Sequence, residues 1–159
     1  MHSIIKNVRV DHRLVHGQVA FTWTKFLGTD CILIVSDEVA KDELRSTALR
    51  MAKPSGMKMV IKSVEDSAKA LNSGVTDKYK LLILFETIED AYRLCQKTDM
   101  IKTVNLGGAK VADDKRQISK AVFVSEKDCE RLKEMNAAGI KLEVQMLPDD
   151  EALDVMSLI

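Results

Sequence analysis

The sequence has few cysteines, and none of them forms a motif. The three are far apart, each lies in an apolar stretch, and no C-x-x-C pair occurs. This pattern indicates free thiols in a reducing compartment and argues against disulfides, a zinc site or a redox motif. The chain also lacks an apolar N-terminal segment and any run approaching about 18 apolar residues. We therefore expect a cytoplasmic protein with neither a leader peptide nor a membrane-spanning helix.

An excess of charge of either sign is also missing. The 24 Lys and Arg side chains balance 24 Asp and Glu side chains, which argues against nucleic acid as a partner. Only two prolines and seven glycines occur in 159 residues, and no repeat, low-complexity tract or linker is visible. A hydrophobic content of 46% suffices for a buried core. We expect residues 1–159 to form a single globular domain.

What the chain does contain is an alternation of short apolar runs and amphipathic segments. The runs predict buried strands at residues 4–10, 31–35, 57–61, 80–85, 101–106, 121–124 and 142–147. The amphipathic segments predict helices at residues 17–26, 37–51, 63–71, 87–95 and 125–136, and Ser or Thr is the expected N-cap of the last four. The polar stretch 106–121 is interpreted as a loop. This alternation predicts an α/β fold, with a mostly parallel sheet of about seven strands and helices on both faces.

The segment from Arg9 to Val19, RVDHRLVHGQV, contains the residues best suited to chemistry. The first strand should end near Asp11 and the first helix should begin near Gly17. His16 would then lie in a strand-to-helix loop at the carboxyl edge of the sheet, where open α/β sheets bind ligands. Histidine is largely neutral at pH 7, so one ring nitrogen has a free lone pair that can attack phosphorus.

The neighbours of His16 suit a phosphoryl group. Backbone N–H groups of Gly17, Gln18 and Val19 would lie at a helix N-terminus, where unpaired donors and the helix dipole favour an anion. The guanidinium of Arg13 can donate two parallel hydrogen bonds to phosphate oxygens. Phosphoryl transfer mostly needs positioning and neutralisation of charge, and these groups supply both without a metal ion or another cofactor.

The same residues allow simpler interpretations. A histidine in a loop is often only a polar surface residue, and the glycine after it can serve only to start a helix. His12 and His16 are four residues apart, like a helical metal-binding pair, but they lie in an expected loop without the glutamate of H-E-x-x-H. We therefore expect no metal site. Asp11 could hold the loop, orient an imidazole, or be an ordinary carboxylate at a strand end.

Other residues are candidates for supporting roles. Asn105, Gly107 and Gly108 could shape a loop beside the histidine or simply form a turn. Arg45, in the middle of a predicted helix, would by its position alone be assigned to a solvated helix face. Trp23 is more consistent with core packing than with an exposed interface.

The segment 11–19 resembles the active-site signature of the IIB components of the mannose/fructose/sorbose family of bacterial sugar phosphotransferase systems. Further matches extend the resemblance over essentially the whole chain: WTK at 23–25, SDEVA at 36–40 followed by Arg45, PSGMK at 54–58 and VNLGG at 104–108. Two positions depart from the family pattern. His12 stands where relatives often have an acidic residue, and Ala109 stands where Met often follows the two glycines.

The resemblance implies a phosphocarrier. A phosphorylated IIA component would give a phosphoryl group to the δ1 nitrogen of His16, and His16 would pass it to a sugar imported through the membrane components IIC and IID. Arg13 would contact the phosphate, and Arg45 would assist transfer to the sugar. The resemblance also implies an open, twisted sheet with one antiparallel strand late in the chain. The carrier would be cytoplasmic and would meet the membrane only through its partners.

Two other classes of α/β protein fit less well. A receiver-like domain needs an acidic pair after its first strand and an aspartate after its third, but His12 interrupts the pair and Lys62 follows the third strand. A nucleotide-binding module needs G-x-G-x-x-G or a P-loop, and the sequence contains neither motif.

Two partners must reach the same histidine in turn, so we expect it to be exposed in a shallow site. The docking surface should be of the transient class, under roughly 1,200 Å² in total. Arg9, Arg13 and Arg45 are expected to add a positive field that steers a negatively charged donor.

Overall fold

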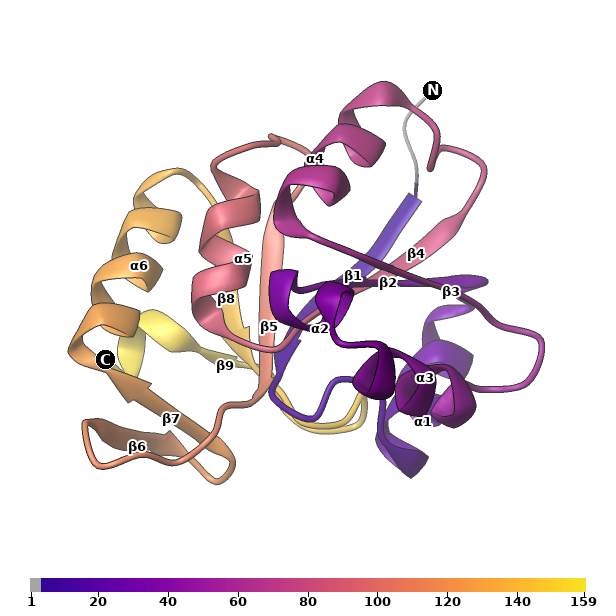
Figure 1. Ribbon diagram of the computed structural model, residues 1–159. Coiled ribbons are helices and arrows are strands. Elements are labelled where there is room, and N and C mark those ends of the chain that lie inside the picture. The colour runs from indigo at the N-terminus through magenta and orange to yellow at the C-terminus, as the bar shows by residue number, and fades with distance from the viewer. Residues whose placement is uncertain (1–3) are drawn as a thin grey trace.

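The computed structural model describes residues 4–159, where strands and helices alternate along most of the chain (Figure 1). The strands are β1 (Ile4–Asp11), β2 (Cys31–Val35), β3 (Lys58–Lys62), β4 (Lys80–Phe85), β5 (Thr103–Gly108), β6 (Lys115–Ser119), β7 (Val122–Ser125), β8 (Lys141–Val144) and β9 (Leu153–Asp154). The helices are α1 (Gly17–Leu27), α2 (Asp37–Lys41), α3 (Glu43–Ala52), α4 (Val64–Ser73), α5 (Ile88–Cys95) and α6 (Glu126–Ala137), followed by the 3-10 turn η1 (Val155–Ser157). No helix in this range has the length and apolar character needed to cross a bilayer.

Within the described residues, seven strands form one sheet in the order β3-β2-β4-β1-β5-β8-β9. Neighbouring strands are parallel from β3 to β8, and only β9 runs antiparallel to its neighbour. Helices α1, α2 and α3 pack on one face of the sheet, and α4, α5 and α6 pack on the other. The expected α/β fold, with a mostly parallel sheet, helices on both faces and one late antiparallel strand, is confirmed.

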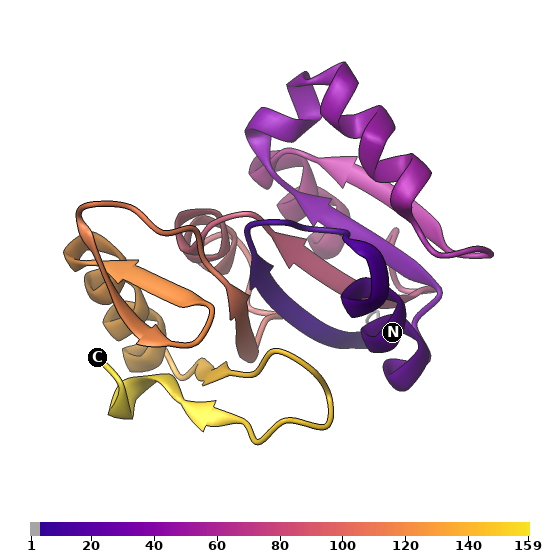
Figure 2. The ribbon, with the colours of Figure 1, turned by 90° about the horizontal axis from the view of Figure 1, so that it is seen from below.

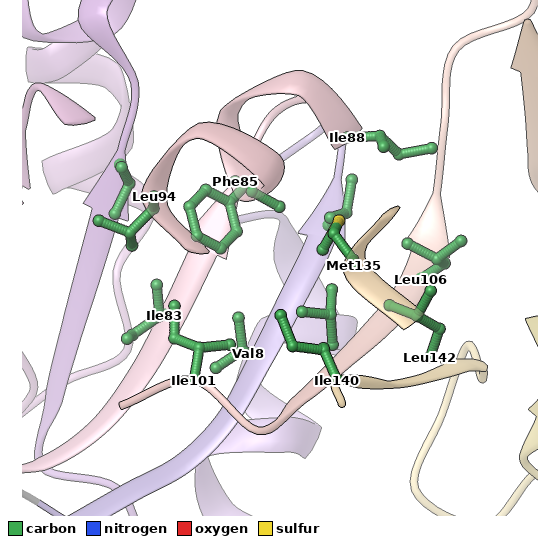
Figure 3. Packing of buried hydrophobic residues seen from close by; sticks show 14 of the residues in the cluster. Val8, Ile83, Phe85, Ile88, Leu94, Ile101, Leu106, Met135, Ile140 and Leu142 are labelled. Atoms are coloured by element: carbon green, nitrogen blue, oxygen red, sulfur yellow. The ribbon is translucent and has the colours of Figure 1, made fainter. Parts of the chain in front are cut away.

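Each face of the sheet has its own hydrophobic core. In β2 and β4, Leu33 and Ile83 face the core under α4, α5 and α6, whereas Ile34 and Leu84 face the core under α1, α2 and α3. Because both faces are buried, these strands are continuous apolar runs rather than alternating ones. Figure 3 shows part of the larger core, which includes Val8, Ile83, Phe85, Ile88, Leu94 and Met135.

The connections that leave β1 and β4 diverge at the carboxyl edge of the sheet. These two strands are parallel neighbours, with Val10 beside Phe85. The helix that follows β1 covers one face, and the helix that follows β4 covers the opposite face. Open α/β sheets bind ligands at such switch points. The loop between β1 and α1, which contains His16, begins here.

Helix starts follow local capping signals. Ser63, Thr87 and Ser125 each accept a hydrogen bond from the backbone N–H three residues further on, and they begin α4, α5 and α6 as expected. The single helix expected at 37–51 is wrong. The chain leaves helical geometry at Asp42 (φ −102°), and the Asp42 side chain accepts a hydrogen bond from the N–H of Arg45, which starts the second helix α3.

The loop expected at 106–121 is partly wrong. Strand β5 continues through Gly108, and residues 115–119 form β6, which pairs antiparallel with β7. This hairpin is separate from the main sheet and lies beside α6 (Figure 2). Because β6 is polar and partly exposed, it has no apolar run that would indicate a strand. The strand expected at 121–124 therefore pairs in the hairpin, and the short β9 is the seventh strand of the sheet.

Candidate functional site

The loop between β1 and α1 is anchored by its own apolar residues. Leu14 and Val15 are buried in the core under α1, α2 and α3. Leu14 has a φ of 56°, a left-handed conformation that is costly for a residue with a side chain. Its N–H donates to the carbonyl of Asp11 (2.9 Å), which closes a tight turn. These anchors hold His16 at the N-cap position of α1.

Asp11 is the centre of the polar contacts in the loop. Its carboxylate is only 2% exposed, and it accepts hydrogen bonds from the backbone N–H of Arg13 (3.0 Å) and from Nε and Nη2 of the same side chain (3.1 and 3.2 Å). Nε2 of His16 lies 3.2 Å from Oδ2 of Asp11. Asp11 therefore both holds the loop and orients the imidazole, two of the alternatives that the sequence left open.

The ionisation of Asp11 determines which nitrogen of His16 carries the proton. Burial by itself raises the pKa of Asp11, but the hydrogen bonds and charge of Arg13, together with the bond from His16, hold that pKa below its usual value. An ionised carboxylate can only accept a hydrogen bond, so Nε2 is protonated and Nδ1 has the lone pair. Among the described residues Nδ1 has no hydrogen-bond partner, and the side chain is 25% exposed. The ring is therefore half-buried but not sealed beneath other side chains.

Helix α1 begins directly after His16 with open backbone donors. The side chain of His16 does not cap the helix, so the N–H groups of Gly17, Gln18 and Val19 have no acceptor within it. No acidic side chain lies in the first turn. The side chain of Arg13 is 39% exposed. The helix N-terminus and this guanidinium give the edge beside His16 a positive electrostatic character.

The end of β5 approaches the loop closely because two of its residues lack side chains. A methyl group on Gly108 would lie 3.2 Å from Oδ1 of Asp11 and 3.3 Å from Nη2 of Arg13. A methyl group on Gly107 would overlap the guanidinium of Arg9. The alternative that these glycines simply form a turn is therefore wrong. They belong to a strand, and they permit contact with the arginine beneath it and the loop beside it.

We expect Gly107→Ala to lower the free energy of unfolding by about 2 kcal/mol, because the new methyl group must displace a buried side chain held by several hydrogen bonds. Gly108→Ala should cost less, since its closest contacts are no shorter than 3.2 Å. Chemical denaturation of the two variants measures both losses. Equal and small losses would show that the guanidinium under Gly107 moves aside easily.

Arg45 lies in a cleft at the same edge of the sheet. The cleft has a volume of about 590 Å³, and its lining includes His12, Arg45, Glu86, Lys110 and Lys115. The Arg45 guanidinium donates a hydrogen bond to Glu86, and this contact raises the pKa of Arg45. Arg45 therefore shares a cleft with the histidine loop instead of lying on a free helix face.

Asn105 contacts a buried arginine rather than the histidine loop. Its Oδ1 accepts a hydrogen bond from Nη1 of Arg9 (2.8 Å), and its Nδ2 donates to Oε1 of Gln145 (3.1 Å). Arg9 is only 2% exposed, so the expectation that it adds to a surface field is wrong. Of the three arginines, only Arg13 and Arg45 are at the surface. The available signal in the sequence was the position of Arg9 between two apolar strand residues, Val8 and Val10, both of which are buried.

Other side chains that could bind a metal are dispersed. Within residues 4–159, no three His, Cys, Asp or Glu side chains are grouped to hold a metal ion. Cys31, Cys95 and Cys129 are free thiols, as expected. Burial raises the pKa of Cys31 to about 11 and that of Cys95 to about 12, so both are protonated at neutral pH. These two cysteines are inert packing residues rather than nucleophiles.

Known proteins resemble the chain along nearly its whole length. A family model described as "PTS system sorbose subfamily IIB component" matches residues 5–159. The chain is 36% identical over 151 residues to the fructose-specific EIIB component of Bacillus subtilis, which covers 95% of this chain and 93% of that protein. It is 40% identical over 161 residues to the mannose-specific EIIAB component of Escherichia coli, which covers 99% of this chain. The chain spans about half of that relative, since the match covers 49% of it.

The fold agrees with these matches. The crystal structure of the IIBSor domain of the sorbose permease from Klebsiella pneumoniae superposes with a TM-score of 0.92 at 30% identity, and the match covers 97% of this chain and 94% of that one. The chain therefore belongs to the sorbose-subfamily IIB components of the sugar phosphotransferase systems.

Proposed function

We propose that this chain is a phosphocarrier that accepts a phosphoryl group on Nδ1 of His16 and transfers it to a sugar. The contact between Nε2 of His16 and Asp11 (3.2 Å) carries the proposal, because it leaves Nδ1 as the free nucleophile. Family membership supports a general role as a component of a sugar phosphotransferase system. The partly exposed ring suits a group that two partners must reach in turn.

In the proposed reaction, one P–N bond replaces another. The lone pair of His16 Nδ1 attacks the phosphorus of a phosphohistidine on the donor, and the donor imidazole leaves with the electrons of its own P–N bond. The proton on Nε2 stays on the His16 ring, where the carboxylate of Asp11 stabilises the positive charge that the ring gains. In the second step a sugar hydroxyl oxygen attacks the phosphorus and its proton passes to a base on the sugar side. The P–N bond to His16 breaks, and its electron pair returns to Nδ1, which regenerates the neutral ring.

The transferred group would be held by donors that the resting site leaves open. The N–H groups of Gly17, Gln18 and Val19 lie at the helix N-terminus, where a dianion is favoured. Arg13 uses Nε and Nη2 to bind Asp11, which leaves Nη1 outside that contact. Nη1 is therefore available for a phosphoryl oxygen. Arg45, in the adjacent cleft, is assigned to the step that passes the group to the sugar.

A phosphorylated IIA component is the proposed donor, and a sugar held by membrane components IIC and IID is the proposed acceptor. The Escherichia coli relative is named as an EIIAB component, which places A and B units in one protein and supports a IIA donor. Relatives named for fructose, mannose and sorbose support a sugar of that class. The carrier would work in the cytoplasm and reach the membrane through these partners.

Incubation with a phosphorylated IIA donor tests the proposal. We expect one phosphoryl group per chain, labile in acid, stable in base and mapped to His16. A base-labile acyl phosphate on an aspartate would instead indicate a receiver-like domain and would overturn the proposal.

Arg13→Lys should slow phosphoryl acceptance although the charge is kept. Lysine cannot reproduce the forked contact with Asp11 and a phosphoryl oxygen. Loss of one charged hydrogen bond in the transition state costs about 2 kcal/mol, or roughly thirtyfold in rate. Rapid-quench kinetics with a phosphorylated donor measures this, and Arg93→Lys, which alters an arginine paired with Asp37, is the matched control. An Arg13→Lys rate within twofold of the parent would show that this guanidinium does not contact the phosphoryl group.

A further inference from the structure

Arg9 is a buried cation whose partners come from β5 and from the segment after β8. Its Nη1 donates to Oδ1 of Asn105 (2.8 Å) and to the carbonyl of Gln145 (3.0 Å), and its Nη2 donates to the carbonyl of Met146 (3.2 Å). The side chain is 2% exposed. These contacts tie the end of β5 and the segment after β8 to β1, the strand that leads into the histidine loop.

Every direct partner of Arg9 is neutral. The guanidinium lies over the ring of Trp23 on α1, 4.4 Å from the centroid, and Nε1 of Trp23 donates to the same Met146 carbonyl (2.8 Å). Within residues 4–159, no carboxylate lies within ion-pair distance of Arg9, and the nearby Asp11 is bound instead to Arg13 and His16. A buried charge without a counter-ion is expensive for a protein. Its presence two residues before Asp11 therefore calls for an explanation.

Arg9 stays charged at neutral pH. Burial lowers the pKa of its guanidinium to about 10, the charge of Asp11 raises it, and the charge of Arg13 lowers it. Arg9 is thus electrostatically coupled to the two charged residues that contact or flank His16. The guanidinium cations of Arg9 and Arg13 and the carboxylate of Asp11 together carry one net positive charge before phosphorylation.

We propose that Arg9 is a built-in counter-charge that stabilises the phosphorylated form of His16, an inference that rests on the proposed function. A phosphoryl dianion on a His16 ring that keeps its Nε2 proton adds one net negative charge, so the net charge of this group changes from one positive to zero. Without Arg9 the phosphorylated group would carry one net negative charge. Interactions between charges are stronger inside a protein than in water, so this difference favours the phosphorylated state. Arg9 acts through this field rather than by touching the phosphoryl group.

The equilibrium constant for transfer from a fixed phosphorylated IIA donor separates this role from a structural one. It is calculated from the phosphorylated and unphosphorylated fractions of both carrier and donor, which are measured by intact mass at alkaline pH, where phosphohistidine persists. Arg9→Gln should lower the constant about tenfold, whereas Arg9→Lys, which keeps the charge but loses hydrogen bonds, should stay within about threefold of the parent. A purely structural role predicts that both variants lower the stability and that neither changes the equilibrium constant.

A second variant tests the charge with Arg9 in place. Asn105→Asp puts a carboxylate where Oδ1 now accepts from Arg9 at 2.8 Å, which neutralises the cation without removing its side chain. We expect a loss similar to that of Arg9→Gln. This variant also decides the question if Arg9→Gln does not fold. The ¹⁵N shifts of His16 should still show a protonated Nε2 in each variant, which verifies that the contact with Asp11 is intact.

The inference and the proposed function fail in different ways. If the parent protein is not labelled on His16, the proposed function fails first. If the parent is labelled but Arg9→Gln and Asn105→Asp both leave the equilibrium constant within twofold, the counter-charge is overturned and the carrier stands. An Arg9→Lys constant as low as that of Arg9→Gln would also overturn it, because the hydrogen bonds and not the charge would then be responsible.

Discussion

We expect His16→Ala to take up no phosphoryl group from a phosphorylated donor and to keep its fold. The change removes the proposed nucleophile, and among residues 4–159 no other imidazole lies within hydrogen-bond distance of Asp11. The structural cost is small, because the ring is partly exposed and does not cap α1. We expect a loss of about 1 kcal/mol or less in the free energy of unfolding.

His12→Ala is the matched control for this prediction. His12 lines the neighbouring cleft, and its ring nitrogen is 3.9 Å from Asp11, beyond hydrogen-bond distance. Labelling of His12→Ala should match the parent in extent. Labelling of His16→Ala at the parental level, or phosphate mapped to His12 in the parent, would refute the assignment of His16.

Asp11→Asn should slow phosphoryl acceptance on the order of a hundredfold, within the usual contribution of an oriented acid–base group. The amide carries no charge to stabilise the imidazolium or to bind Arg13, and it no longer requires the proton to be on Nε2. Rapid-quench kinetics measures the rate, and ¹⁵N shifts of His16 report the tautomer. Asp37→Asn is a suitable control, since Asp37 binds the N–H of Val64 and the side chain of Arg93 instead. A rate within twofold of the parent would show that Asp11 has no part in the reaction.

The same variant should change the response of stability to acid. The pKa of Asp11 is lower in the folded protein than in the unfolded chain, so its stabilising contribution is complete above the unfolded value of about 4 and is lost as the pH falls through the folded value. Asp11→Asn removes that contribution at every pH. The difference in unfolding free energy between parent and variant should therefore shrink below about pH 4.

The parts of the fold that depend on neighbouring residues were predictable. Strand β1 ends at Asp11 and α1 begins at Gly17, as the pattern of apolar residues indicates. The N-caps Ser63 and Thr87 act on backbone N–H groups only three residues away. The break at Asp42 is equally local, but no proline or glycine marks it in residues 37–51.

Contacts between residues that are far apart in the sequence were harder to predict. Polar β6 has no apolar run that would indicate a strand. Without β6, its partner β7 is expected in the main sheet, whereas the two strands form a separate hairpin. The sequence suggests a loop-shaping or turn role for Gly107, but its lack of a side chain permits a contact with an arginine nearly one hundred residues earlier. Arg9 was placed at the surface because its neutral partners lie at positions 105, 145 and 146.

The sequence by itself determined the α/β class, the family, and the set of candidate residues in one strand-to-helix loop, because these follow from short-range patterns of residue type. Tertiary structure alone decided that Nε2 of His16 faces Asp11, that Asn105 binds Arg9, and that Arg45 shares a cleft with His12. The first contact depends on how the loop folds back on β1, and the other two depend on strand order and helix packing. These features bring together residues whose proximity cannot be inferred from their spacing in the sequence. A site of this kind is therefore recognisable from its sequence, but the roles of its charges can be assigned only from its geometry.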